Sequence, residues 1–286
     1  MYTTLISVND LQQQYTNPDW VVVDCRFDLS DPEQGRRDYL EAHIPGAQYA
    51  HLDHDLSAQA GSGGGRHPLP DGEALTALFS RLGIDADCQV VAYDAAGGGF
   101  AARLWWLLRY MGHTAVAVLD GGWPAWLAAG GDTRSGEETR SARDFRGEPN
   151  DALRILIDAV GKVPLLVDSR DPARYRGEFE PLDPAAGHIP GAYNRFWKHN
   201  LGAGDHFRPA AELAREFADL FSGQEPEAAV FYCGSGVTAC HNVLAAVHAG
   251  LPQPRLYAGS WSEWCADSAR PVATGSDIDR VDSDDV

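Results

Sequence analysis

The chain repeats itself once, and this repeat limits what it can fold into more than any other feature. Ordered matches at nearly one spacing indicate two copies of one domain in tandem. The offsets between the copies drift slowly, from 144 and 145 to 139 and 138. The four matches are VVVDCR (21–26) with LLVDSR (165–170), HIPGA at 43–47 and again at 188–192, VVAYDAAGGG (90–99) with AVFYCGSGVT (229–238), and LDGGWPAW (119–126) with YAGSWSEW (257–264).

Each copy alternates short apolar runs with amphipathic segments. Continuous apolar runs of this length are typical of strands buried on both faces, and we expect them at 21–23, 90–93, 115–119, 165–167, 229–232 and 255–257. Helical spacing of apolar residues follows at 73–82, 100–110, 211–221 and 239–249. The alternation predicts an α/β fold of two tandem domains, each a mostly parallel sheet flanked by helices on both faces.

Composition sets the expected boundaries of these domains. The first domain is expected over residues 1–130 and the second over 151–274, with a polar linker at 131–150 between them. The last stretch, 275–286, is an acidic tail with the composition of a disordered segment.

Charge and cysteine usage exclude several classes of protein. The 286 residues hold 41 acidic and 23 basic side chains, a formal charge of −18, and no basic run offers a surface for nucleic acid or an anionic membrane. The N-terminus has no secretory pattern, and no apolar run reaches the roughly 18 residues that a membrane span needs. The five scattered cysteines form no CxxC and no zinc-site spacing, so we expect a reduced cytoplasmic protein without a bound metal.

The two copies differ where a strand runs through a glycine-bearing loop into a helix. In an open parallel sheet, ligands bind at the carboxyl ends of the strands, where such a loop points its backbone N–H groups at the ligand. The second copy has Cys233 at this point and the first has Asp94. We expect the glycines after Cys233 and the following helix N-terminus to favour its thiolate, which makes Cys233 the candidate nucleophile. The alternative is a small buried cysteine that only packs.

The ordered set of motifs resembles the tandem-rhodanese sulfurtransferases over about residues 5–270. The segments that support the resemblance are CGSGVTA at 233–239, both HIPGA elements and the endings LDGGWPAW and YAGSWSEW. The resemblance implies a silent first domain and a persulfide on Cys233 that passes its sulfur to cyanide or to a thiol acceptor such as thioredoxin. It implies no cofactor, since the persulfide is the carrier. Gly234, Gly236, Val237 and Thr238 would form the anion-binding loop around it.

The same resemblance bears on the sulfur donor. The small neutral loop resembles the branch of the family that uses 3-mercaptopyruvate, whereas thiosulfate-using members have basic residues beside the cysteine. Arg174 matches the arginine that would bind the carboxylate of the donor, and Arg176 is a possible assistant; the alternative for both is a solvated surface charge. The pattern departs from the family at Asp183, where a second arginine is expected, so thiosulfate stays open as the donor.

Ser235 is the candidate proton relay, with His43 of the first domain as a possible support. The alternative for His43, and for its repeat His188, is a histidine that only fixes the turn before proline. Of the other histidine-bearing segments, HLDHD (51–55) lacks a third ligand at a defined spacing for a metal, and the glycine-rich stretch 60–68 is expected to be a flexible connector.

Two further functions compete with the sulfurtransferase interpretation. A cysteine phosphatase or arsenate reductase would need an arginine six residues after the cysteine, but that position is Ala239. A non-catalytic rhodanese-like module for binding or sulfur sensing stays possible. Cys240, two helical turns beyond Cys233, is interpreted as a packing residue rather than a resolving thiol.

Overall fold

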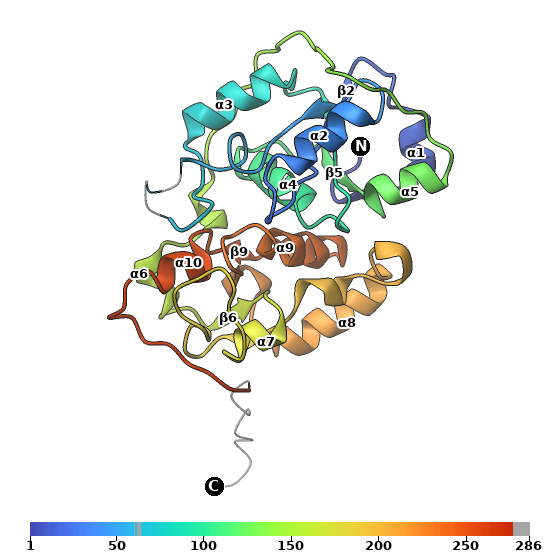
Figure 1. The fold of residues 1–286 in the computed structure, drawn as a ribbon. Coiled ribbons are helices and arrows are strands. Elements are labelled where there is room, and N and C mark those ends of the chain that lie inside the picture. Colours follow the sequence, from blue (N-terminus) through green and yellow to red (C-terminus); the bar gives the residue numbers. More distant parts are fainter. Residues whose placement is uncertain (60, 62–63, 277–286) are drawn as a thin grey trace, which may run out of the picture.

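Two sheet-and-helix domains lie one above the other in the computed structural model, which describes residues 1–59, 61 and 64–276 (Figure 1). The acidic tail expected at 275–286 lies outside the described residues from 277 on, as do residues 60, 62 and 63 of the glycine-rich stretch. Among the described residues, no helix is long and apolar enough to cross a membrane.

The first domain is built around a parallel sheet with the strand order β1-β5-β4-β2-β3 over the described residues. Its strands are β1 (Leu5–Ile6), β2 (Trp20–Asp24), β3 (Gln48–Tyr49), β4 (Gln89–Tyr93) and β5 (Val116–Leu119). Its helices are α1 (Val8–Gln12), α2 (Gln34–Glu41), α3 (Gly72–Arg81), α4 (Ala101–Tyr110) and α5 (Gly122–Ala128).

The second domain repeats this plan with the strand order β7-β6-β8-β9, again all parallel. Its strands are β6 (Leu165–Asp168), β7 (Tyr193–Asn194), β8 (Ala229–Tyr232) and β9 (Arg255–Leu256). Its α-helices are α6 (Ile157–Val160), α7 (Pro172–Tyr175), α8 (Ala210–Phe221), α9 (Ala239–His248) and α10 (Ser260–Trp264). Short 3₁₀ turns lie at Asp151–Leu153, Trp197–Asn200, Ala203–Asp205 and Pro226–Ala228.

The central strands confirm the pattern expected from the sequence. β4 and β8 are fully buried along their length, because helices cover both faces of a parallel sheet. The register is repeated as well: Asp24 lies opposite Tyr93 in the first sheet, and Asp168 lies opposite Tyr232 in the second. The predicted α/β class, with two domains of parallel sheet flanked by helices, is confirmed.

The helices α4 and α9 bring the two domains together (Figure 1). Every residue of α4 except Arg109 is buried, and α9 is buried from Ala239 to Ala246. A helix that is apolar nearly all round must be covered on all sides, and each of these covers its own sheet and the other domain. Each helix starts directly after one of the glycine-bearing loops. The packing of α4 on α9 therefore places both loops close to the domain boundary.

Candidate active site

Cys233 lies at the exit of β8, in the loop that leads to α9. Its side chain is buried, and its backbone is fixed against the start of α10. The N–H of Cys233 donates to Ser260 Oγ at 3.1 Å, and its carbonyl accepts from the N–H of Trp261 at 3.0 Å. Gly236 has φ 73°, and a Cβ atom there would lie 2.2 Å from the carbonyl oxygen of Ala258. Only glycine fits this close approach, so the loop geometry depends on Gly236.

The corresponding loop of the first domain is closed by its own carboxylate. Asp94 Oδ1 accepts from the N–H groups of Ala96 and Gly98, and Oδ2 from those of Phe100 and Ala101, all at 2.8 Å. In the second domain, none of the N–H groups of residues 234–238 donates to another described residue. In the first domain the Asp94 carboxylate accepts hydrogen bonds from the backbone N–H groups of the loop. In the second domain the corresponding N–H groups remain available to an anion, as in other backbone anion sites.

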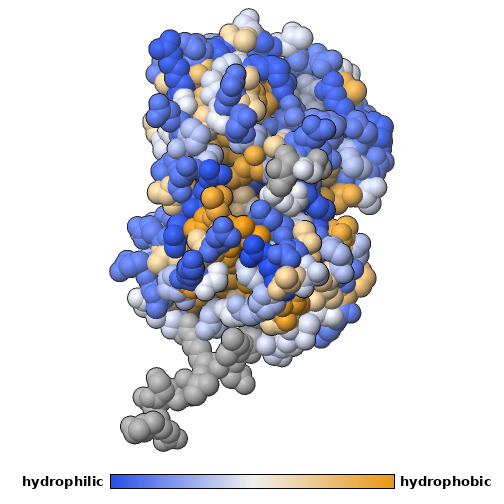
Figure 2. All heavy atoms as spheres, turned by 90° about the vertical axis from the view of Figure 1, so that its left-hand side faces the viewer, coloured by the Kyte–Doolittle hydropathy of each residue, from blue (hydrophilic) through white to orange (hydrophobic). Residues whose placement is uncertain are grey.

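A cavity of about 450 Å³ opens over this loop at the boundary between the domains. The expected residues Cys233, Gly234, Ser235, Val237, Thr238 and Arg174 line it, together with Arg66 and His67 of the first domain. Leu29 and Leu182, each about half exposed, line it as well. Figure 2 shows apolar side chains gathered in the middle of one face, at the level where the two domains meet.

Ser235 is the first member of a hydrogen-bonded chain that crosses the domain boundary. His67 Nδ1 lies 2.7 Å from Ser235 Oγ, and His67 Nε2 lies 3.0 Å from Asp53 Oδ1. A carboxylate only accepts, so Nε2 carries the proton of the neutral ring and Nδ1 is left to accept from the serine hydroxyl. The three side chains have the order of a proton relay that ends beside Cys233.

The surroundings of His67 keep this ring neutral. Burial, followed by the charge of Arg103, lowers the pKa of His67 to about 4 against the opposing pull of Asp53. Arg103 comes from α4 and is fully buried. Its guanidinium donates to the carbonyl of Gly236 at 2.9 Å and to that of His67 at 3.1 Å. It therefore holds the Cys233 loop and the His67 segment in one fixed arrangement.

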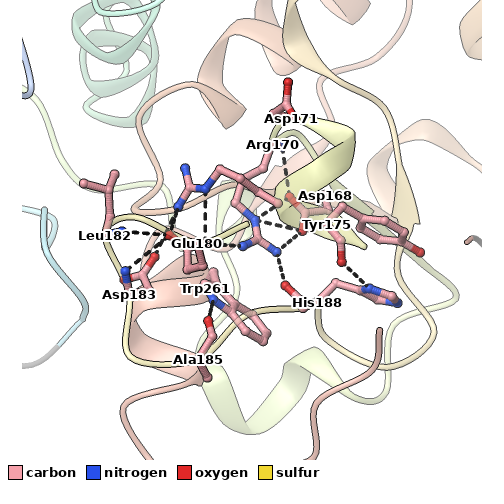
Figure 3. A network of polar contacts seen from close by, with 12 residues as sticks. Asp168, Arg170, Asp171, Tyr175, Glu180, Leu182, Asp183, Ala185, His188 and Trp261 are labelled. Carbon is pink, nitrogen blue, oxygen red and sulfur yellow. Dashed lines mark hydrogen bonds and ion pairs between the residues drawn. The ribbon is translucent and has the colours of Figure 1, made fainter. Parts of the chain in front are cut away.

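Two arginines, one from each domain, lie beside Gly234. A Cβ atom at Gly234 would lie 2.9 Å from Arg66 Nη2 and 3.6 Å from Arg174 Nη2. Both guanidinium groups also contact acidic side chains of the loop that follows α7. Arg174 pairs with Glu180 at 2.7 Å, and Arg66 forms an ion pair with Asp183. Figure 3 shows both carboxylates, Glu180 and Asp183. Although burial opposes it, Arg174 lowers the pKa of Glu180.

The structure corrects the expectation for His43. Its Nδ1 lies 2.7 Å from the carbonyl of Tyr39, and its ring stacks on that tyrosine away from the cavity lining. His188 repeats the arrangement, with Nδ1 2.8 Å from the carbonyl of Tyr175. Both histidines fix the turn of the HIPGA motif, which was the alternative interpretation. Arg176 pairs with Glu178 and is not part of the cavity lining.

Sequence reasoning missed Arg66, His67 and Asp53. The first two end the glycine-rich stretch expected to be a flexible connector, and Asp53 lies in HLDHD. Gly65, with φ 83°, lets this segment approach α10 closely: a Cβ atom there would lie 2.4 Å from Ser262 Oγ. The N–H of Arg66 donates to the same Oγ at 3.1 Å. A basic residue and a histidine directly after a glycine run were the only local signal.

One group of side chains in the described part of the chain resembles a metal site. Ligand atoms of Glu33, His51 and His54 lie within 4.8 Å of one another. However, His51 Nδ1 accepts the backbone N–H of Asp53, so the neutral ring carries its proton on Nε2, the atom that faces Glu33. The two imidazoles also stack at 4.3 Å, so their nitrogens do not converge on one point. This geometry does not fit a metal ion.

Both halves of the chain match one family of domains. The model of the rhodanese-like domain matches residues 7–129 and again residues 150–267. These ranges contain both glycine-bearing loops and all the described strands except β1.

Individual relatives match over nearly the whole length. A protein of Pseudomonas aeruginosa named "Probable 3-mercaptopyruvate sulfurtransferase" is 49% identical over 280 residues, which are 95% of this chain and 98% of the relative. The thiosulfate sulfurtransferase of Bos taurus is 30% identical over 92% of both chains. The solved structure of the 3-mercaptopyruvate sulfurtransferase from Leishmania major superposes with a TM-score of 0.84 at 29% identity, covering 92% of this chain and 74% of that one.

Proposed function

The chain belongs to the rhodanese family as a tandem sulfurtransferase, and from this premise we propose that it moves a sulfane sulfur from 3-mercaptopyruvate through a persulfide on Cys233 to an acceptor. The donor is the one that the Pseudomonas and Leishmania relatives are named for. The division into a silent domain at 1–130, a linker at 131–150 and a catalytic domain at 151–274 is part of the same proposal.

The proposed first half-reaction balances without a cofactor. The Cys233 thiol and the mercapto group of the donor give a cysteine persulfide and pyruvate. The Sγ–S bond forms as the C–S bond breaks, and the electron pair of the broken bond goes to the pyruvate enolate. That enolate must then take up a proton. The N–H groups of the loop after Cys233 would stabilise the thiolate before the step and the persulfide anion after it.

The observation on which the choice of donor rests is the chain Ser235–His67–Asp53. Breaking a carbon–sulfur bond leaves a carbanion equivalent that needs a proton, and Ser235, hydrogen-bonded to His67, would deliver it. Thiosulfate releases sulfite instead, which leaves as a stable anion and needs no proton. A proton relay at this position therefore supports a mercaptopyruvate donor over thiosulfate.

Arg174 and Arg66 are the proposed carboxylate-binding residues. Both line the cavity with Cys233, and both lie over Gly234. Arg66 would stand in for the second arginine that the family motif has in place of Asp183. A pair of guanidinium groups beside the nucleophile suits the single carboxylate of the donor.

A thiol is the proposed acceptor of the second half-reaction, with thioredoxin and cyanide as the representatives to be assayed. The persulfide would lie at the base of a cavity with leucines at its lining, which a small thiol or an extended peptide thiol can enter. The five cysteines of the chain are all free, which suits the reducing cytoplasm that we propose as its location.

The test compares two donors in wild type and Ser235→Ala. We expect Ser235→Ala to lower turnover of 3-mercaptopyruvate roughly 100-fold or more, the usual contribution of a general acid, and to change the thiosulfate:cyanide rate less than threefold. Rates with cyanide and with a dithiol acceptor would be measured side by side, with Cys233→Ser as the blank.

The outcomes separate the competing functions. Equal losses with both donors would refute the relay and leave thiosulfate as the donor of a rhodanese. Equal, negligible rates in wild type and Cys233→Ser would refute the enzyme mechanism on Cys233 and support a binding or sulfur-sensing module.

A further inference from the structure

A carboxylate of the chain itself already bridges the two arginines beside Gly234. Asp183 forms an ion pair with Arg66 Nη1, and its Oδ2 lies 3.4 Å from Arg174 Nη2. The Asp183 side chain is only 3% exposed, whereas that of Arg66 is 30% exposed. Figure 3 shows Asp183 and Glu180 in one loop, close to the buried Arg170. The donor carboxylate therefore enters a site whose cations are already partnered.

The ion pairs around these arginines form one continuous network. Arg170 pairs with Asp168 and Glu180, Arg174 pairs with Glu180 and Asp183, and Arg66 pairs with Asp183. Three guanidinium groups thus face three carboxylates, and the formal charge of the network is zero. The other charged side chains that line the cavity are Lys198, Asp171 and Asp205, which add no net positive charge.

This balance has a consequence for the charge of the donor. A guanidinium pair without internal carboxylates would attract a dianion more strongly than a monoanion. With Asp183 in place, the Arg66–Arg174 pair is already compensated, and the second negative charge of a dianion is repelled by the buried carboxylate of Asp183. Burial, reinforced by Glu180, raises the pKa of Asp183 against the pull of Arg66.

We propose that Asp183 is the residue that sets the charge selectivity of the donor site, favouring monoanionic sulfur donors over dianionic ones by neutralising the Arg66–Arg174 pair. The proposal rests on the proposed role of Cys233 as the sulfur acceptor. Asp183 touches the arginines and not the reacting sulfur, so it is a specificity-determining residue. On this proposal, the aspartate that replaces the second arginine of the family motif has a function of its own.

Two donors that differ in charge but not in chemistry test this role. Thiosulfate is a dianion and methanethiosulfonate a monoanion. In both, the Cys233 thiolate attacks the terminal sulfur, the S–S bond of the donor breaks, and sulfite or methanesulfinate leaves with the electron pair. The quantity measured is the ratio of kcat/KM for thiosulfate to kcat/KM for methanethiosulfonate, with cyanide as the acceptor.

Asp183→Asn removes the charge and keeps the size of the side chain. We expect it to raise the thiosulfate:methanethiosulfonate ratio roughly tenfold or more, since one unit charge beside the site is uncovered. Asp183→Glu keeps the charge. Glu178→Gln removes an exposed charge from the same loop, that of the carboxylate paired with Arg176. Both control variants are expected to keep the wild-type ratio within about twofold.

A double variant guards against a merely structural effect. Arg66→Gln together with Asp183→Asn removes one cation and one anion, so the network is neutral again and the ratio should return towards the wild-type value. A ratio unchanged in Asp183→Asn, or still raised in the double variant, would overturn the proposal. If Asp183→Asn does not fold, the double variant must still show the wild-type ratio, and a raised ratio there refutes the charge argument.

The two proposals can fail separately. The ratio uses donors whose S–S bond breaks, so it does not depend on mercaptopyruvate or on the Ser235 relay. A ratio shift in Asp183→Asn without mercaptopyruvate turnover in wild type would refute only the proposed donor. Mercaptopyruvate turnover with an unshifted ratio would refute only the role of Asp183.

Discussion

The buried His67 allows a quantitative prediction about stability and pH. His67 has a pKa of about 4 in the folded protein, against 6.5 for an ordinary histidine, because burial and Arg103 oppose its charge. Between pH 6.5 and pH 4, His67 is protonated in the unfolded chain but stays neutral in the folded protein. The free energy of unfolding therefore decreases as the pH falls from 6.5 to 4. Its full size corresponds to about 3 kcal/mol of unfolding free energy, and it vanishes above pH 6.5.

The comparison of wild type with His67→Gln isolates this contribution. Urea unfolding of both proteins at intervals from pH 7.5 to pH 4 gives the difference in unfolding free energy at each pH. The acidic side chains that do not contact His67, and the buried His241, are common to both proteins, so their titration cancels. We expect the wild type to lose about 3 kcal/mol relative to His67→Gln over this range. Parallel curves would show that His67 titrates normally and would refute the account of a neutral relay.

Two further substitutions test the groups that hold the loops. Arg103→Met leaves the buried carbonyls of Gly236 and His67 without their donor, so we expect the free energy of unfolding in urea to fall by roughly 3–5 kcal/mol. Arg103→Lys should recover part of this loss. A loss below about 1 kcal/mol in Arg103→Met would contradict the prediction. Asp94→Ala leaves four N–H groups without a partner and is expected to cost a similar amount, while folded protein still loads sulfur on Cys233, as intact-mass spectrometry would show. Full stability of Asp94→Ala would mean that water replaces the carboxylate at no cost.

The features that the sequence predicted are those encoded by local pattern and repetition. Buried parallel strands need continuous apolar runs, so the runs at 90–93 and 229–232 identified β4 and β8. The repeat then placed Asp94 and Cys233 at equivalent strand ends, and the structure shows both at the exits of these strands. Arg174 could be predicted as a site residue because it lies on a motif of the resembled family, close to the end of a buried strand. The structure has it in the cavity lining.

The partners of Ser235 could not be predicted in the same way. His67 is 168 residues away, in a segment without helical or strand periodicity, and its position depends on how that segment docks on α10. His43 was easier to single out from the sequence than His67, because it belongs to a repeated motif. The repetition itself, however, indicated a structural role. A residue whose contacts recur in both copies, as those of His43 and His188 do, is explained by the shared fold. A residue with contacts across the domain boundary, such as His67, has no equivalent contact in the other copy of the repeat, so comparing the two copies does not identify it.

The first domain contributes to the site although it lacks a cysteine at the equivalent position. Its loop is closed by Asp94, which caps the N–H groups at the start of α4 and so fixes the helix from which Arg103 reaches the Cys233 loop. The same domain supplies His67 and Arg66 through the segment that docks on α10. The carboxylate that stands in place of the cysteine therefore also stabilises the element on which the second domain's loop rests. At the equivalent strand exits, one copy thus has Cys233 and an open loop, and the other has a carboxylate that fixes the helix supporting that loop.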